Sequence, residues 1–392
     1  MENIQLMNVQ RQHEQHAEEY EQAVLEVLRS GRYIGGPEVT SFENEFAAYM
    51  GAKYGISCGS GTDALILAMR ALNVGPGDEV ITVSFTFFST AESIVAVGAK
   101  PVFVDVCEDT YCIDPKRIEE KITDKTKAIL AVHFYGHSAD MTAIRAIADR
   151  HGISVITDCA QATGTTYEGS RANTLGDVTC FSFFPTKNLG CDGDGGMVLT
   201  NNEDLAIACR SYKVHGSGSD GLYTLKKQYE AKGEQMPANM PIGASKYYNY
   251  LIGYNSRLDA LQAALLRRKL THIEEFVAGR RKNAALYNEA LKDTEYILPY
   301  EAPNTEHSYY VYALQHPRAQ EIMEKLHGLG VPCQTYYPVP LHMQGAFAEL
   351  GYHEGDMPIT ERLSKTTFAI PVFPELTDEE RDYIVEALKK VL

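Results

Sequence analysis

The sequence predicts an α/β protein, with a larger lobe built on a mostly parallel β-sheet and a smaller C-terminal α+β lobe. Between residues 54 and 157, short apolar runs typical of buried strands alternate with segments whose apolar residues recur at helical spacing. Such alternation is typical of βαβ units, whose helices cover both faces of a parallel sheet. Because 392 residues exceed what one simple core holds, we expect two lobes, at residues 1–255 and 256–392.

The elements follow from the periodicity in chain order. Two amphipathic helices are expected first, at Glu14–Arg29 and Val39–Tyr49. The strands expected next are Tyr54–Cys58, Glu79–Thr82, Val102–Val106, Ala128–His133 and Ser154–Thr157. The helices expected between them are Thr62–Leu72, Thr86–Val97 and Met141–Arg150. Another helix should begin at Asp114–Pro115, because proline is favoured at the first helical position.

The pattern changes after residue 157. Strands are expected at Cys180–Phe184 and Met197–Thr200, on either side of a glycine-rich stretch. Residues 217–250 show little periodicity and predict an inserted surface loop, long enough to indicate a functional or interface role. A long helix at Leu258–Leu286 then leads into the C-terminal lobe.

Charge and composition exclude several classes of function. A net charge of −16 argues against nucleic acid as a main partner, because phosphate backbones need clustered Lys and Arg. No apolar run approaches the ~20 residues that span a bilayer, and Met1–Gln12 has no apolar signal core. The 8 cysteines form no C-x-x-C pair, so we expect neither a metal site nor a disulfide framework. Reduced cysteines are typical of the cell interior, so we expect a cytoplasmic location.

The first candidate motif is Gly59-Ser60-Gly61-Thr62-Asp63-Ala64, between an expected strand and an expected helix. A helix N-terminus presents free N–H groups that bind phosphate, and Ser60 and Thr62 add hydroxyl donors. A plain strand-to-helix turn is the alternative. The string also fits the dinucleotide fingerprint G-x-G-x-x-A, with Asp78 following, which would indicate a nicotinamide-dependent sugar oxidoreductase. Against that stand the two helices expected before the motif, since the fingerprint usually opens its domain.

Two further motifs follow strands. Asp158, in Thr157-Asp158-Cys159-Ala160-Gln161, lies where ligands of parallel sheets bind, and its carboxylate could pair with a pyridinium nitrogen or cap the next segment. Lys187 follows the aromatic strand expected at Cys180–Phe184 and precedes a glycine-rich stretch. An unpaired buried ammonium is costly, so a lysine there is either a nucleophile for imine formation or a side chain that reaches the surface.

The fourth motif is the loop Gly253-Tyr254-Asn255-Ser256-Arg257, which runs into the long expected helix. Ser256 is a plausible N-cap, whereas Asn255 and Arg257 could bind an anion.

These four motifs, in this order and spacing, resemble the DegT/DnrJ/EryC1/StrS family of sugar aminotransferases, which belong to fold type I of the pyridoxal-phosphate (PLP) enzymes. The resemblance runs from about Ile4 to the C-terminus. Its most specific strings are S-G-T-D-A-L, D-C-A-Q, S-F-F-P-T-K-N-L-G and G-Y-N-S-R-L-D-A-L-Q-A-A. Two departures are the segment Gln334–Pro338, where many relatives carry a His-Tyr-x-Pro-type motif, and the length of the 217–250 segment.

The resemblance implies a role for each matching residue. Lys187 would carry PLP covalently and then move protons, Asp158 would bind the pyridine nitrogen, and Gln161 would contact the ring hydroxyl. The phosphate would be held by Ser60, Gly61, Thr62 and Ser182 of one subunit, joined in a homodimer by Asn255 of the partner subunit. Phe87 would stack on the ring. The expected substrate contacts are His215, Arg257, Tyr336 and Tyr337.

The implied reaction moves an amino group from an amino acid, usually L-glutamate in this family, to a keto-sugar that is typically nucleotide-linked. The string Thr62-Asp63-Ala64-Leu65 resembles relatives acting at the sugar 3-position more than those acting at the 4-position. Dehydratases of the family resemble this chain with His in place of Lys187, so Lys187 argues against that branch. A PLP-binding regulator without catalysis is the non-enzyme alternative.

Overall fold

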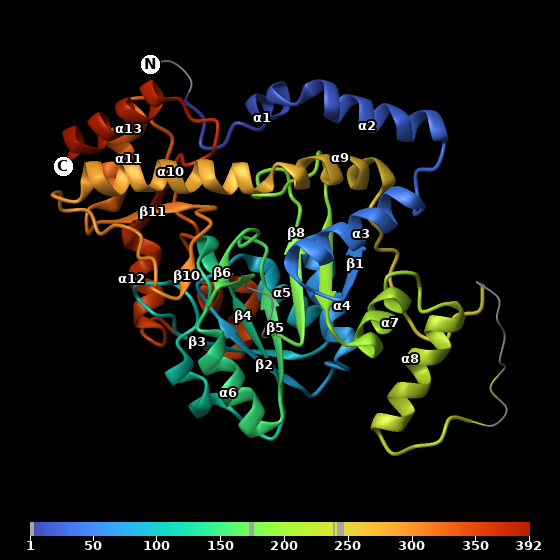
Figure 1. The fold of residues 1–392 in the computed structure, drawn as a ribbon. Coiled ribbons are helices and arrows are strands. Elements are labelled where there is room, and N and C mark those ends of the chain that lie inside the picture. The colour runs from blue at the N-terminus through green and yellow to red at the C-terminus, as the bar shows by residue number, and fades with distance from the viewer. Residues whose placement is uncertain (1–3, 172–175, 238–239, 241–246) are drawn as a thin grey trace.

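The computed structural model describes residues 4–171, 176–237, 240 and 247–392 (Figure 1). In this part of the chain the main sheet has seven strands in the order β1-β9-β8-β5-β4-β2-β3. They are β1 (Tyr54–Cys58), β2 (Glu79–Val83), β3 (Lys100–Val104), β4 (Thr126–Val132), β5 (Ser154–Asp158), β8 (Val178–Ser182) and β9 (Gly196–Thr200). Strands β3, β2, β4, β5 and β8 pair in parallel, and β9 is antiparallel to both β1 and β8. The predicted α/β class with a mostly parallel sheet is confirmed.

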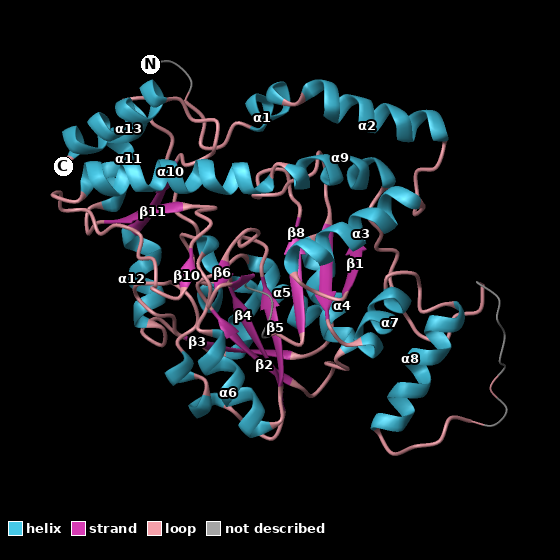
Figure 2. Cartoon of the chain, in the orientation of Figure 1, coloured by secondary structure: helices cyan, strands magenta, loops and turns pink. Residues whose placement is uncertain are grey.

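Helices cover both faces of this sheet (Figure 2). One face packs against α4 (Gly61–Ala71), α5 (Phe88–Ala96), α6 (Met141–His151) and α7 (Glu203–Tyr212). The other face packs against α3 (Pro37–Met50) and α9 (Ala260–Thr271), and α2 (Ala17–Ser30) packs on α9 as an outer layer. Because successive residues of a strand point to opposite faces, Cys180 belongs to the first core and its neighbour Phe181 to the second.

Two predicted strands lie two residues earlier than expected. β3 ends at Val104 although the apolar run continues, and Val106 instead forms an isolated bridge with Ile113. β8 ends at Ser182, and the chain then turns, with the Phe183 carbonyl accepting a hydrogen bond from the Cys191 N–H. In both places the apolar run shows which residues are buried. The strand itself ends earlier, where the backbone bends and pairing with the neighbouring strand stops.

The predicted helix Leu258–Leu286 is two helices, α9 and α10 (Ile273–Leu291), which meet at His272. The single-helix prediction was wrong because apolar periodicity continues through the junction. His272 has non-helical angles (φ −103°, ψ 0°), and its Nε2 lies 3.0 Å from a Glu19 carboxylate oxygen on α2. The short helix α1 (Val9–Gln15) and α2 also meet at a histidine, His16, and they run along α10 and α9 (Figure 1).

The prediction of a loop at 217–250 was wrong for its first part, which forms α8 (Gly218–Ala231). Among the residues of this helix only Gly221 and Thr224 are buried, so its contact face carries no apolar signal. Residues 238–239 and 241–246 of the predicted loop lie outside the described residues. The helix predicted from Asp114 consists of two 3-10 turns, Pro115–Arg117 and Glu119–Lys121, and α7 was not predicted.

The C-terminal part contains β11 (Tyr312–Gln315) paired antiparallel with β12 (Thr367–Ile370). Around them pack α11 (Ala319–Gly328), α12 (Pro358–Thr366) and α13 (Asp378–Val391), with 3-10 turns at Leu341–Met343 and Gly345–Leu350. A small sheet joins β10 (Thr305–Glu306), β6 (Thr166–Tyr167) and β7 (Ser170–Arg171), and another 3-10 turn spans Phe134–Gly136. Helix α10 contributes to two cores, with Phe276 in one and Tyr287 in the other, so the boundary at residue 255 stays a prediction. None of the described helices is long and apolar enough to cross a membrane.

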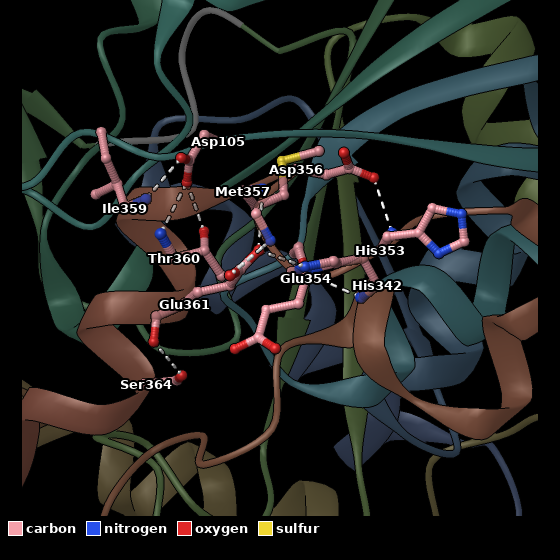
Figure 3. A network of polar contacts seen from close by, with 12 residues as sticks. Asp105, His342, His353, Glu354, Asp356, Met357, Ile359, Thr360, Glu361 and Ser364 are labelled. Atoms are coloured by element: carbon pink, nitrogen blue, oxygen red, sulfur yellow. Dashed lines mark hydrogen bonds and ion pairs between the residues drawn. The ribbon is translucent and has the colours of Figure 1, made fainter.

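A buried polar network joins the C-terminal part to the sheet (Figure 3). At the end of β3, the Asp105 carboxylate accepts hydrogen bonds of 2.9 Å from the backbone N–H groups of Ile359 and Thr360 in the first turn of α12. A carboxylate there satisfies free N–H groups and the positive end of the helix dipole. The next residue of α12, Glu361, accepts a hydrogen bond from the imidazole Nε2 of His342 at 3.2 Å. The network therefore fixes α12 and His342 relative to the sheet.

Candidate active site

A cavity of about 380 Å³ lies at the carboxyl ends of β5 and β8, where the N-terminus of α4 approaches them. Most of the predicted site residues line it. They are Ser60, Gly61, Thr62, Phe87, Asp158, Gln161, Ser182, Lys187 and Tyr337. Parallel sheets bind ligands at this edge because strand ends from distant sequence segments meet there. The structure thus brings together predicted residues from five separate segments, three of which are the first three motifs.

The N-terminus of α4 forms a tight cradle in this cavity. Ser60 is the N-cap, and its hydroxyl accepts a hydrogen bond from the Asp63 N–H at 3.1 Å. A Cβ on Gly61 would lie 2.7 Å from the Cβ of Ser182, so only glycine allows this approach of the two segments. Hydroxyl groups of Ser60, Thr62 and Ser182 thereby gather at a helix N-terminus, which is a suitable place for a phosphate group.

Ser256 supports this cradle instead of capping a helix. Helix α9 begins at Ala260 with Asp259 as its N-cap residue, so the predicted cap role of Ser256 was wrong. The Ser256 hydroxyl accepts a hydrogen bond from the Gly59 N–H at 3.0 Å and donates one to the Asp63 carboxylate at 2.7 Å. The 253–258 loop is therefore fastened to the first motif within one chain.

Asp158 is a buried carboxylate at the end of β5. Its Oδ1 accepts a hydrogen bond from the Ala160 N–H and its Oδ2 one from the Thr90 hydroxyl, both at 3.1 Å. Burial raises the pKa of Asp158 above its ordinary value, and these two hydrogen bonds and the Lys187 charge act in the opposite direction. A cationic ligand group in the cavity would stabilise the ionised carboxylate further.

Lys187 lies in the turn after β8, with its Nζ 4.4 Å from the centre of the Tyr310 ring. Burial raises the pKa of the Tyr310 hydroxyl, but the Lys187 charge and the hydrogen bonds to it outweigh burial, so this pKa lies below its ordinary value. Tyr310 was not predicted as a site residue, because no motif surrounds it and only the fold brings it to Lys187.

Gln161 and Phe87 are held at the wall and the mouth of the cavity. The Gln161 Oε1 accepts the Tyr135 N–H at 2.8 Å, which leaves its amide nitrogen as the donor that faces Tyr337 at 3.4 Å. Phe87 is 51 % exposed, and its ring centre lies 5.6 Å from that of Tyr337. An exposed aromatic face at a cavity mouth is available to stack on a planar ligand.

The other predicted residues lie outside this cavity. Tyr336 lines a neighbouring one of about 450 Å³, which shares Thr186 and Tyr310 with the first. His215, Asn255 and Arg257 are exposed. Their segments adjoin, since the His215 N–H donates to the Tyr254 carbonyl at 3.0 Å and Asn255 forms a bridge with Val214. The roles assigned to these four residues, like those assigned to the residues that line the cavity, stay predictions.

The dinucleotide interpretation of Gly59–Ala64 finds no support in the topology. That fingerprint belongs to a parallel βαβ unit. In the described part of the chain β1 is an edge strand that pairs with β9 in antiparallel fashion.

Residues 14–389 match the model of the DegT/DnrJ/EryC1/StrS aminotransferase family. The chain belongs to this family. The aminotransferase is 44 % identical over 389 residues to the "Pleiotropic regulatory protein" of Geobacillus stearothermophilus, covering 98 % of each chain. It is 39 % identical to the UDP-2-acetamido-2-deoxy-3-oxo-D-glucuronate aminotransferase of Pseudomonas aeruginosa, covering 98 % of this chain and 99 % of that one.

Solved structures agree with this assignment. The aminotransferase superimposes on DesV from S. venezuelae with a TM-score of 0.91 at 36 % identity, covering 100 % of this chain and 98 % of that one. PLP is the cofactor of the aminotransferases of this family.

Proposed function

We propose that this aminotransferase moves an amino group from an amino acid, with L-glutamate as the expected donor, to the 3-position of a nucleotide-linked keto-sugar. The observation that carries the proposal is the meeting of Lys187 and Asp158 in one cavity beside a helix N-terminus. The name of the P. aeruginosa relative, which specifies a 3-oxo nucleotide-linked sugar, supports the acceptor class. A 4-keto acceptor is the alternative.

The cavity fits PLP, which when bound supplies an electron sink through its protonated ring nitrogen. Asp158 would hold that proton at the ring nitrogen, because a buried carboxylate next to a cation favours the charged pair. The cradle of Ser60, Gly61, Thr62 and Ser182 would hold the phosphate. The Gln161 amide would donate to the ring oxygen, and Phe87 would cover one face of the ring.

Lys187 would bind the cofactor covalently and, once displaced by the amino donor, carry protons at its Nζ. A base needs to lie within hydrogen-bonding reach of the carbon whose proton it takes, and Lys187 projects into the cavity for this. Tyr310, with its lowered pKa, lies close enough to stabilise the positive charge whenever Nζ is protonated.

The exposed loop around Asn255 supports a homodimer with shared sites. Large apolar side chains flank it, and Ile252 is 88 % exposed while Ile34 is 52 % exposed. Ile34 lies against Asp259 through an isolated bridge, so both apolar residues border the same loop. A second copy covering this surface would remove it from water and place Asn255, Arg257 and His215 over the cavity of the partner.

The 8 free cysteines of this chain, of which only Cys107 is not buried, fit the expected cytoplasmic location.

A binding-only regulator is the second candidate, favoured by the name of the G. stearothermophilus relative. Binding alone requires neither a lysine that can move protons nor room for an acceptor. The presence of Lys187, Asp158 and Tyr310 in one cavity therefore supports the enzyme.

The test is an absorbance spectrum of the purified protein reconstituted with PLP. We expect an absorption band near the edge of the visible range from lysine-bound cofactor, and we expect excess L-glutamate to bleach it. Adding a 2-keto acid should restore the band, because the amino group then leaves again. A stable band in the presence of glutamate and other amino acids would favour the regulator, and tight binding of a nicotinamide cofactor would favour the oxidoreductase.

A further inference from the structure

We propose that Thr90 is a positioning residue of this site, whose hydroxyl orients the Asp158 carboxylate toward the cofactor and is itself oriented by Thr86. The inference rests on the proposed role of Asp158. Thr90 lies in α5 and does not line the cavity, so it acts only through Asp158.

The direction of the hydrogen bonds follows from counting protons. The Thr90 Oγ1 lies 3.1 Å from the Asp158 Oδ2 and 3.0 Å from the Thr86 Oγ1. An ionised carboxylate only accepts, so the single hydroxyl proton of Thr90 goes to Asp158. Thr86 must then donate to Thr90. Thr86, Thr90 and Asp158 are all buried, so water does not compete for these bonds.

Two different elements fix the plane of the carboxylate. Thr90 on α5 holds Oδ2, and the N–H of Ala160 in the turn after β5 holds Oδ1. With both oxygens held from behind, their remaining lone pairs are available to the cavity that Asp158 lines. Loss of one of these two hydrogen bonds would let the carboxylate rotate. A change in angle weakens the hydrogen bond between the carboxylate and a charged ligand group.

Few groups around Asp158 stabilise its ionised form, so the hydrogen bond from the Thr90 hydroxyl matters. Burial raises the pKa of Asp158, opposed by the Ala160 N–H, the Thr90 hydroxyl and the Lys187 charge. Three further titratable neighbours of Asp158 carry no charge. Burial raises the pKa of Cys159, of Cys180 and of Tyr337, so these groups stay neutral.

The segment that carries Thr86 and Thr90 is anchored from the C-terminal part of the chain. The Ser84 hydroxyl accepts the backbone N–H of His342 at 3.0 Å, and its oxygen also lies 2.6 Å from the His342 Nδ1. On the other side of the ring, the His342 Nε2 lies 3.2 Å from a Glu361 carboxylate oxygen, in the network of Figure 3. The start of the segment is thus held rigidly while Thr90 at its end reaches Asp158.

The test compares Thr90→Val with Thr90→Ser and with a matched control, Thr82→Val. Thr82 is a buried threonine of β2 whose hydroxyl donates to the Leu130 carbonyl at 2.9 Å, away from Asp158. We expect Thr90→Val to slow the glutamate half-reaction about tenfold and to weaken PLP binding to the apoprotein severalfold, since hydrogen bonds to charged groups are among the stronger ones. Thr90→Ser, which keeps the hydroxyl, should restore most of both.

The pH profile separates positioning from a loss of packing. Without the Thr90 hydroxyl the pKa of Asp158 rises, so the ionised form is lost at a higher pH, and the acid limb of the half-reaction profile should move upward. Thr82→Val should lower thermal stability without moving this limb. Equal profiles for Thr90→Val and Thr82→Val would overturn the proposal. If Thr90→Val does not fold, Thr90→Ala supplies the comparison.

Asp158→Asn tests the proposed role of Asp158 separately from that of Thr90. If this variant is as active as the wild type, the proposed role of Asp158 fails and the role of Thr90 fails with it. If Asp158→Asn is impaired while Thr90→Val keeps its half-reaction rate and its PLP affinity, only the role of Thr90 fails.

Discussion

Replacing Lys187 with alanine is expected to lower turnover by about 10⁴-fold, the upper end of what one positioned acid–base group contributes. The cofactor should still bind, because the α4 cradle, Asp158, Gln161 and Phe87, which all line the cavity, are proposed to hold its other parts. Its spectrum should lack the lysine-bound band, and added glutamate should give a bound species that does not turn over. Stopped-flow absorbance with glutamate measures this directly.

A matched lysine separates chemistry from stability. Lys269 on α9 is more deeply buried, with 6 % of its side chain exposed, and its Nζ lies 3.1 Å from the Asp192 carboxylate. Lys269→Ala should reduce thermal stability, because it removes a buried side chain that lies over the Tyr20 ring. Its half-reaction rate per folded molecule should stay normal. Methylamine in solution should restore part of the rate of Lys187→Ala by replacing the missing base, and near-normal turnover of Lys187→Ala without it would refute the assignment.

The sequence alone predicted the part of the site that follows strand ends. Asp158 is the last residue of β5 and Lys187 lies in the turn after β8, and parallel strands place their carboxyl ends along one edge. Gly61 was predicted from the same logic, since a helix N-terminus after a strand meets that edge too. Local pattern and this property of sheets indicated the positions, whereas the resemblance to the family supplied the roles.

Residues that reach the site through packing were not predictable in this way. Tyr310 meets Lys187 only because the segment that precedes β11 folds back over the sheet. Thr90 is one of many small polar residues in its helix, and nothing in the local sequence distinguishes it from Ser89 or Ser93. Its significance follows from a single hydrogen bond, which exists only in the folded chain.

Helix boundaries failed for a related reason. Apolar periodicity passes through His272 without interruption, so it cannot report that the backbone breaks there to bring the imidazole to Glu19. In α8 the opposite happens, because a helix whose buried residues are Gly221 and Thr224 leaves no apolar pattern to detect. Periodicity reports which face is buried and says little about elements that bury little apolar surface.

The position of Asn255 leads to a prediction about mixed dimers, in which two defective variants restore each other's activity. Lys187 and Asp158 line the same cavity of one chain, whereas Asn255 is exposed and does not line it. If Asn255 completes the site of the partner subunit, inactive Lys187→Ala and impaired Asn255→Ala homodimers should complement each other after subunit exchange. Random pairing of equal amounts makes half of the dimers hybrids, and each hybrid contains one site with both residues intact. Activity should therefore rise to about a quarter of that of the wild type.

A second mixture serves as the control for this experiment. Lys187→Ala and Asp158→Asn alter residues of one cavity within one chain, so in their hybrids each of the two sites keeps one defect. That mixture should show no recovery under the same exchange conditions, with exchange itself verified by two affinity tags on the two variants. Recovery in the Asn255→Ala mixture alone would establish the composite site. Absence of recovery in both mixtures, with exchange demonstrated, would mean that Asn255 serves the cavity of its own chain or acts only in folding, and the shared-site arrangement would then be wrong.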